Sequence, residues 1–216
     1  MWTNSLPPEL LNTVHCMDCL ELMRTLPDGC IDLVLTDPPY WLWKKLSQWW
    51  GKHKNSRMRK DYEWWPQRDE KPTHEYFDEL FRVSKSQIIR WWNYFDLPAT
   101  RCFLVWDKLQ YMPTFSMCEY ARTSFDKPAK IYQQRTTDEE VLREHPTQKT
   151  VWLFRRILEN YSEQWMTILD CFAWSWTTWV ACKELGRNYI LVEKEPKYCD
   201  IIHKRLQNTT VSLFHS

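Results

Sequence analysis

Hydrophobic positions switch between strand-like and helix-like spacing most clearly in the last third of the chain. Strands are expected at residues 167–170 and 189–193, with a helix at 177–185 between them and another from Pro196 to about residue 207. Gly186 is well placed to end the first of these helices, and Pro196 to begin the second. Strands that alternate with helices are typical of an α/β protein with a parallel sheet.

An apolar run near the N-terminus predicts a strand that is buried on both faces. It covers residues 31–36 and ends at residues 37–40, Asp-Pro-Pro-Tyr. Two prolines cannot continue a central strand, so the chain is expected to leave the sheet here, at the carboxyl end of the strand. A short strand at 13–17 and an amphipathic helix that stops at 27–29 precede this run.

The middle of the chain begins with residues 41–73, which have no periodicity and predict a long loop. Further elements are expected as a helix near 74–84, strands at 87–90, 102–106, 116–125 and 129–133, and a helix through Leu153, Ile157 and Tyr161. The length suits one domain, so residues 1–216 are interpreted as a single domain.

Glycine and tryptophan counts depart sharply from average usage. The chain has 3 Gly and 15 Trp, whereas glycine normally supplies roughly 7% of residues. Collagens, flexible linkers and glycine-rich nucleotide loops all require glycine. A GxGxxG or Walker loop is therefore absent from the sequence as written.

Charge and cysteine content exclude several other classes. The net charge is +1, so a nucleic-acid partner must be held by a local basic patch. Eight scattered cysteines with a lone CxxC at 16–19 favour reduced thiols over a zinc site, and no metal is expected. No apolar run has the length of a membrane span and no signal peptide is evident, which predicts a cytoplasmic protein.

Two strand ends carry the candidate chemistry, because ligands in open α/β sheets bind beyond the carboxyl ends of strands. At the first end, Asp37 offers an acceptor, Pro38 and Pro39 hold exposed carbonyls in a rigid backbone, and Tyr40 offers an aromatic face. This combination suits an exocyclic amine on a planar base, whose hydrogens need acceptors while its ring stacks. A proline turn with a surface tyrosine is the plainer alternative.

Further motifs follow in a fixed order along the chain: His-Pro-Thr-Gln-Lys at 145–149, Leu-Asp-x-Phe-Ala-x-Ser-x-Thr-Thr at 169–178, and Tyr-Ile-Leu-Val-Glu at 189–193. Together with residues 37–40, they resemble the S-adenosylmethionine-dependent DNA amino-methyltransferases of the N4/N6 type, in which DPPY precedes the cofactor motif. The resemblance implies a Rossmann-like methyltransferase fold, with a mostly parallel sheet, helices on both faces and a circularly permuted motif order.

The resemblance also assigns roles to residues. Asp37 and the Pro38 carbonyl would accept hydrogen bonds from the target amine, and Tyr40 would stack on a base flipped out of the duplex. Glu193 would bind the ribose of S-adenosylmethionine, and Asp18 is a candidate partner for its adenine, although either acid could instead cap a helix or be solvated. The remaining candidate cofactor residues are His145, Thr147, Gln148, Lys149, Asp170, Phe172, Ala173, Trp174, Ser175, Trp176, Thr177 and Thr178.

The DPPY form of the motif points to the N6 amino group of adenine in DNA. Contacts with DNA phosphates are expected from the basic residues of the long loop, which are Lys44, Lys45, Lys52, Lys54, Arg57, Arg59 and Lys60. The alternative is that this part of the chain is only an exposed loop. A small target-recognition region is expected at 90–135. Alternative substrates are cytosine N4, an RNA base or a protein glutamine. A DNA-binding pseudoenzyme is the alternative without catalysis. The sequence leaves open whether a cognate restriction endonuclease exists and which oligomeric state the protein has.

Trp174 and Trp176 stand where the family has glycines, at a turn that needs positive φ and a close approach to the cofactor. An indole at either place is expected to enter the cofactor's volume. Either the protein carries these tryptophans and is impaired, or UGA codons that some bacterial lineages read as glycine have been decoded as tryptophan. We favour the second hypothesis, with Trp106 as the best candidate for a true tryptophan; TGG codons at 174 and 176 would contradict it.

Overall fold

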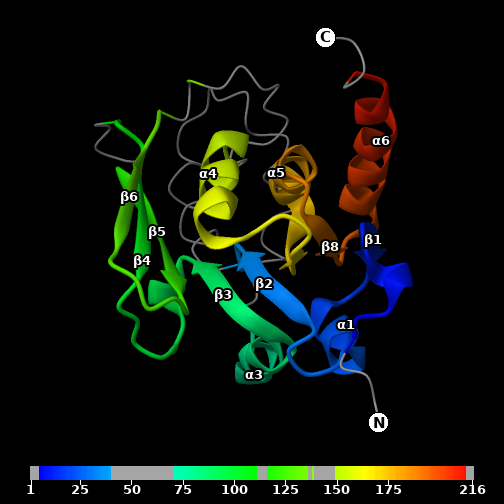
Figure 1. Ribbon diagram of the computed structural model, residues 1–216, viewed down its shortest axis with the longest axis horizontal. Helices are drawn as coiled ribbons and strands as arrows, with labels where there is room; N and C mark the ends of the chain where they lie inside the picture. Colours follow the sequence, from blue (N-terminus) through cyan, green and yellow to red (C-terminus); the bar gives the residue numbers. More distant parts are fainter. Residues whose placement is uncertain (1–4, 40–70, 111–115, 136–137, 139–148, 213–216) are drawn as a thin grey trace, which may run out of the picture.

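The computed structural model describes residues 5–39, 71–110, 116–135, 138 and 149–212 (Figure 1). Its centre is a sheet of eight strands in the order β1-β8-β7-β2-β3-β5-β4-β6. The strands are β1 (Thr13–Cys16), β2 (Ile31–Thr36), β3 (Ser84–Arg90), β4 (Phe103–Asp107), β5 (Cys118–Thr123), β6 (Lys130–Gln133), β7 (Thr167–Asp170) and β8 (Asn188–Glu193). Every neighbouring pair is parallel except those of β5, which runs antiparallel to β3 and β4.

Helices cover both faces of this sheet, as the sequence predicts (Figure 1). The α-helices are α1 (Cys19–Thr25), α3 (His74–Val83), α4 (Val151–Tyr161), α5 (Thr177–Leu185) and α6 (Pro196–Ser212). Short 3-10 helices are η1 (Pro8–Leu10), η4 (Trp92–Tyr94) and η5 (Ala173–Ser175). The expectation of a mostly parallel α/β sheet of the Rossmann-like kind is confirmed.

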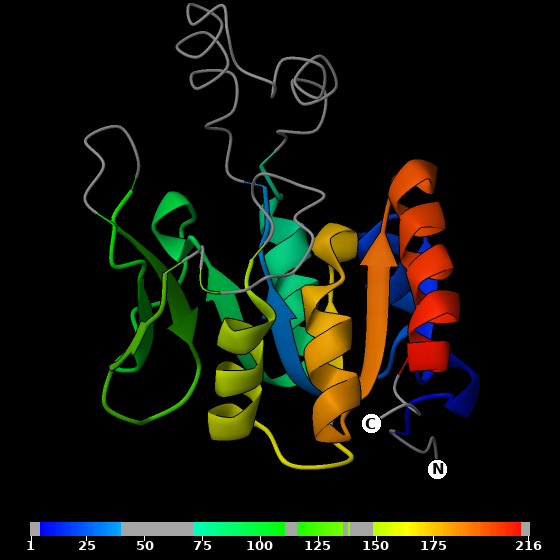
Figure 2. The ribbon, with the colours of Figure 1, turned by 90° about the horizontal axis from the view of Figure 1, so that it is seen from above.

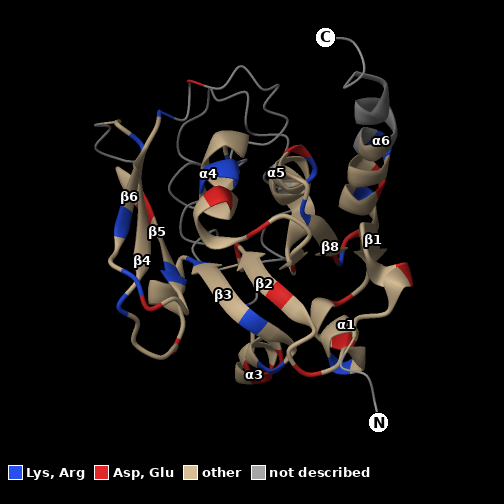
Figure 3. Cartoon of the chain, in the orientation of Figure 1, with Lys and Arg blue, Asp and Glu red and all other residues tan. Residues whose placement is uncertain are grey.

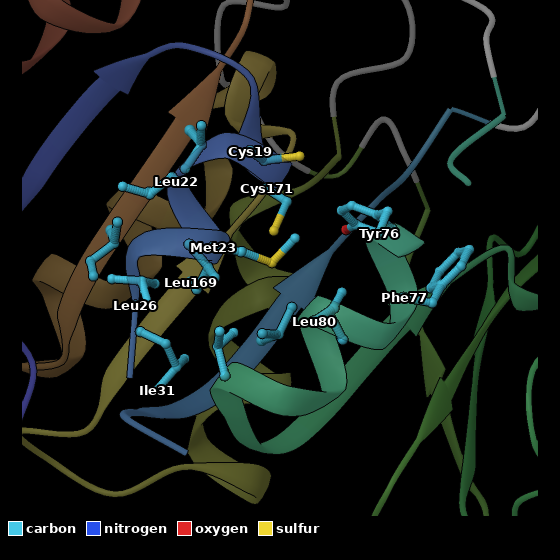
Figure 4. Packing of buried hydrophobic residues seen from close by; sticks show 14 of the residues in the cluster. Cys19, Leu22, Met23, Leu26, Ile31, Tyr76, Phe77, Leu80, Leu169 and Cys171 are labelled. Carbon is cyan, nitrogen blue, oxygen red and sulfur yellow. The ribbon is translucent and has the colours of Figure 1, made fainter. Parts of the chain in front are cut away.

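Alternating side chains of β2 divide the core between the two faces. Val34 belongs to a cluster with Leu22 of α1 and Leu80 of α3 (Figure 4). Leu33 and Leu35 belong to the opposite cluster, which packs against α4 and α5. Because successive strand residues point to opposite faces, a strand covered on both sides must be apolar at every such position. The continuous apolar run is therefore the signature of this central strand.

Most predicted elements appear where the pattern places them. The strands at 31–36 and 167–170 and the helix at 177–185 have the predicted bounds, and α6 continues beyond residue 207 to Ser212. Gly186 caps α5 with a φ of 68°, as its position predicts. The expected loop at 41–73 falls largely outside the described residues.

The stretch at 90–135, expected to hold a target-recognition region, is mostly part of the main sheet. It contributes β4, β5 and β6, which extend the sheet beyond β3. Its segments between strands, some of which lie outside the described residues, are left as the candidates for base recognition. That role stays a prediction.

Left-handed backbone conformations fall on tryptophan unusually often. Among the described residues other than glycine, five have positive φ, and three of these are Trp91 at 51°, Trp165 at 69° and Trp176 at 49°. An L-residue pays roughly 1–2 kcal/mol in this region, whereas glycine enters it freely. The backbone at these three positions thus suits glycine, which supports the decoding hypothesis.

Trp106 shows the opposite behaviour. It lies in β4 with 4% of its surface exposed, and its indole Nε1 donates a hydrogen bond to the Gln134 carbonyl at 3.0 Å. A buried indole whose N–H has a partner is a well-integrated core residue. The structure therefore supports Trp106 as a tryptophan.

A pair of substitutions at Trp165 tests the backbone argument. Its side chain is 77% exposed, so little packing is lost on truncation. Trp165→Gly is expected to be more stable than Trp165→Ala by about 1 kcal/mol, because alanine is strained at positive φ. Urea unfolding of both variants measures the difference.

Arg156, in the middle of α4 and exposed, provides the matched control. There the order should reverse, with alanine more stable than glycine by about 1 kcal/mol, since glycine is a poor helix former. If alanine is also the more stable residue at position 165, the left-handed backbone is not the constraint that we infer.

Candidate active site

The order of the strands reverses between β7 and β2. From β7 the chain passes through α5 to β8 on one side, and from β2 through α3 to β3 on the other. β7 and β2 themselves are paired in parallel, with Leu33 opposite Ile168. In open α/β sheets, such a reversal is where ligands bind, in a crevice outside the carboxyl ends of the strands. These ends lie along the upper edge of the sheet in Figure 2. Asp170 ends β7 and Asp37 follows β2, so a carboxylate stands on each side of this point.

Asp170 fastens the turn that follows β7. Its side chain is buried, with Oδ2 accepting a hydrogen bond from the Thr178 hydroxyl at 2.5 Å and Oδ1 accepting one from the Phe172 backbone N–H at 3.1 Å. The pKa of Asp170 is raised to about 7. Burial is the largest cause, the two hydrogen bonds oppose it by lowering the pKa, and nearby Asp37 and Glu193 raise the pKa further. The carboxyl group thus ties β7 to the first turn of α5.

The turn itself has the backbone of a glycine-containing loop. Trp176 is the residue before α5, with φ 49° and ψ 2°, and Ala173 in η5 is almost fully buried. The Trp176 side chain packs against the cluster of Ala173, Trp179, Leu191 and Ile202. The strain at Trp176 therefore lies in its backbone, because its side chain packs against neighbouring residues. Trp174 is half-buried.

Two further acids lie at the ends of the neighbouring strands. Glu193 ends β8 and is buried, with Oε1 accepting a hydrogen bond from the Glu195 N–H at 2.8 Å. Asp18 follows β1, caps α1 by accepting from the Leu20 N–H at 2.9 Å, and pairs with Lys194 at 3.1 Å. Asp18 is thus a helix cap, as the plainer alternative has it, and its contact with adenine stays a prediction.

Asp37 has one carboxylate oxygen in an ion-pair cluster and the other without a hydrogen-bond partner. Oδ2 lies 3.5 Å from Lys149 Nζ and 3.9 Å from Arg90 Nη1. Oδ1 is buried and has no hydrogen-bond partner among the described residues, and Pro38 beside it is buried. A buried acceptor without a partner costs about 1–3 kcal/mol, which a bound donor would offset.

The structure places Lys149 beside Asp37, and the Lys149 carbonyl accepts a hydrogen bond from the Thr177 hydroxyl at 3.3 Å. The HPTQK segment therefore joins the two strand ends through its last residue. Arg90 and Glu119 also belong to this cluster. Their contact could not be predicted from the sequence, because it depends on the antiparallel pairing of β3 with β5.

Several predicted site residues lie outside the described parts of the chain. These are Tyr40, His145, Thr147, Gln148 and the basic residues Lys44, Lys45, Lys52, Lys54, Arg57, Arg59 and Lys60. Ser175 lies in η5, but nothing is described of its side chain. Their roles stay predictions.

Within the described residues, no group of three or more His, Cys, Asp and Glu side chains is placed to hold a metal ion. Cys16 of the CxxC pair is exposed, whereas Cys19 is buried. In the same part of the chain, no helix has the length and apolar character needed to cross a membrane.

The raised pKa of Asp170 predicts a pH dependence of stability. The unfolded acid ionises near its ordinary pKa of 3.8 and the folded one near 7, so stability is lost as pH rises through this window. Asp170→Asn removes the loss, and its stability relative to wild type should rise by on the order of 4 kcal/mol between about pH 4 and 7.

Urea unfolding at a series of pH values measures this difference. Asp126→Asn, which removes an acid that is 86% exposed, corrects for the loss of one negative charge. Parallel pH profiles for wild type and Asp170→Asn would contradict a buried, protonated Asp170.

Comparisons with known proteins agree with this geometry. The type II methyltransferase M.HinfI of Haemophilus influenzae is 26% identical over 262 residues, covering 92% of this chain and 69% of the relative. The solved M1.HpyAVI complex with SAM is 20% identical, with a TM-score of 0.58, over 89% of this chain and 98% of that one. PvuII DNA methyltransferase, titled cytosine-N4-specific, is 14% identical, with a TM-score of 0.60, over 90% and 85%. At these identities the structures show a shared fold.

A family model described as DNA methylase, for the N6 and N4 methyltransferases, matches residues 51–204. The matched range includes the turn at 169–178, for which a cofactor role stays a prediction, and begins after Asp37, so the DPPY motif is independent of this match. It also contains β7, α5 and β8, which form one side of the crevice. The chain belongs to the family of N6/N4 DNA methylases.

Proposed function

We propose that this protein transfers a methyl group from S-adenosylmethionine to the exocyclic N6 of adenine in DNA. The observation that carries the proposal is the buried Oδ1 of Asp37 at the strand reversal, which has no hydrogen-bond partner among the residues that the structure describes. Acceptor atoms in this place suit an amine donor. The family supplies the reaction class, and the motif supplies the choice of amine.

The residues at the ends of β7 and β8 fit the methyl donor. Buried Glu193 has carboxylate oxygens suited to ribose hydroxyls, and Phe172 lies at the start of the turn beside them. The turn backbone at Trp176 has the left-handed conformation that such a loop requires, although it carries tryptophan. When bound, S-adenosylmethionine supplies a methyl group already activated by its sulfonium. No covalent enzyme intermediate is required.

Asp37 and Pro38 act on the amine of the target base. Its two hydrogens would be accepted by Asp37 Oδ1 and the Pro38 carbonyl, which favours a tetrahedral nitrogen whose lone pair points at the methyl group. Tyr40 would stack on the ring. A base in a duplex can reach this position only after it has flipped out of the stack. Positioning of the reactants then supplies much of the rate enhancement.

DNA would be held by the basic residues of the loop at 41–73, which neutralise phosphates without reading sequence. This assignment rests on the absence of acidic residues from 44–60. If the protein belongs to a restriction–modification system, a cognate endonuclease that recognises the same DNA sequence would accompany it.

Cytosine N4 is the second candidate amine. The fold is shared with a DNA methyltransferase titled cytosine-N4-specific, so the architecture serves either base. Asp rather than Ser at position 37 favours adenine, because within the family the cytosine enzymes more often have SPPY.

Transfer of a labelled methyl group to duplex oligonucleotides, followed by nucleoside analysis, tests the proposal. The product is expected to be N6-methyladenine, and Asp37→Ala should lower the rate by at least about 100-fold, as for loss of a transition-state acceptor. Glu75→Ala, at the exposed Arg24–Glu75 ion pair, is the control and should keep the wild-type rate.

Labelled methyl groups in N4-methylcytosine, in RNA or in protein would contradict adenine N6 as the acceptor and identify one of the alternative amines instead. DNA binding without any binding of S-adenosylmethionine, measured by calorimetry, would instead identify a pseudoenzyme. The same assay on the Trp174→Gly/Trp176→Gly double variant shows whether the turn limits the activity.

A further inference from the structure

A buried cluster of charged side chains lies behind Asp37. Glu119 of β5 is at its centre and only 6% exposed. Its Oε2 pairs with Arg90 Nη2 and lies 3.1 Å from Lys149 Nζ, and its Oε1 lies 2.7 Å from Lys108 Nζ. One carboxylate therefore contacts three cations from separate parts of the chain.

Two of these cations also face Asp37. The ammonium of Lys149 lies 3.5 Å from Asp37 Oδ2, and Arg90 Nη1 lies 3.9 Å from the same oxygen. Lys108 has no such contact among the described ion pairs. Glu119 Oε2 and Asp37 Oδ2 thus share the same pair of cations, one carboxylate on either side.

Burial makes the cluster sensitive to geometry. Arg90 and Lys149 are 2% and 7% exposed, so both cations are largely removed from bulk water. Burial alone would raise the pKa of Glu119, but Lys149, Arg90 and Lys108 lower it to about 2. Glu119 is therefore an anion at neutral pH, and a buried anion fixes the cations around it.

The arrangement leaves the two oxygens of Asp37 in different surroundings. Oδ2 is directed at the cations, whereas Oδ1 has no hydrogen-bond partner among the described residues. Arg90 Nη1 is likewise buried without a hydrogen bond in that part of the chain, and its guanidinium packs 5.6 Å from the Phe154 ring centre. A side chain held at one oxygen leaves the other available to a donor.

We propose that Glu119 is a positioning residue for methyl transfer, which holds Lys149 and Arg90 so that they orient Asp37 toward the target amine. The proposal rests on the function proposed above. Glu119 itself touches neither substrate. Its effect passes through the cations to Asp37, so it should act on the rate of the chemical step and leave the binding of S-adenosylmethionine, on the far side of Asp37 at β7 and β8, unchanged.

A charge-balanced double variant separates positioning from simple charge burial. Glu119→Gln alone would leave Arg90, Lys149 and Lys108 without the carboxylate that they share. Glu119→Gln/Lys108→Met removes one charge of each sign and retains Arg90 and Lys149. The measurements are thermal unfolding, calorimetric Kd for S-adenosylmethionine, and the single-turnover methylation rate at saturating DNA. Glu75→Gln, at the exposed Arg24–Glu75 pair, is the matched control.

The double variant is expected to unfold cooperatively and to bind S-adenosylmethionine with a Kd within about twofold of wild type, while its single-turnover rate falls at least about tenfold, as for a misplaced catalytic group. The wild-type rate in the folded double variant would overturn the proposal. If the double variant does not fold, Glu119→Asp takes its place. It keeps the charge but retracts the carboxylate by one methylene, and the same loss of rate is expected; an unchanged rate again overturns the proposal.

Crystal structures of wild type and the folded variant give a readout that does not depend on activity. The Lys149 ammonium should lie within about 4 Å of Asp37 in wild type and move away in the variant. An unmoved Lys149 and Asp37 would overturn the positioning role. Absence of methyl transfer by wild type, with the expected movement still observed, would count against the proposed function alone.

Discussion

The pairing of β7 with β2 is the constraint on which the site depends. Of these neighbouring strands, β7 ends at Asp170 and β2 ends just before Asp37, and the chain leaves them in opposite directions. The helices that follow cannot both cover the crevice between them, so it stays available to ligands. The carboxyl groups of Asp170 and Asp37 differ in their hydrogen bonding. Asp170 is buried in the turn and bonded to Thr178, whereas one oxygen of Asp37 has no hydrogen-bond partner in the described part of the chain.

The second constraint is the backbone of the turn after β7. The chain must reverse within residues 171–176 to enter α5, and it does so with positive φ at Trp176. Glycine meets this demand without strain, and tryptophan does not. That Trp91 and Trp165 show the same conformation, and the buried Trp106 does not, links the unusual composition to specific backbone positions.

The sequence predicts the fold well where local pattern decides it. Strand β2 is recognisable because residues 33–35 are apolar on both faces of the strand and two prolines follow its end, and α5 because its apolar spacing stops at Gly186. Both strand ends of the site follow from this reading. The resemblance adds the roles of their residues, which geometry alone does not assign.

The rest of the site depends on contacts between residues far apart in the chain. Arg90 and Glu119 meet because β5 enters the sheet antiparallel to β3, and no spacing in the sequence encodes that pairing. The resemblance makes Lys149 a candidate cofactor residue, and its place beside Asp37 follows from the path of the chain into α4. The left-handed conformation of Trp165, which no motif marks, is likewise visible only in the structure.

The most direct test of the account is a crystal structure of the protein with S-adenosylhomocysteine and a DNA duplex. We predict the ribose at Glu193, the sulfur at the crevice between Asp170 and Asp37, and a flipped adenine whose amine donates to Asp37 Oδ1. A cofactor bound elsewhere on the sheet, or a target base whose amine does not reach Asp37, would contradict the account.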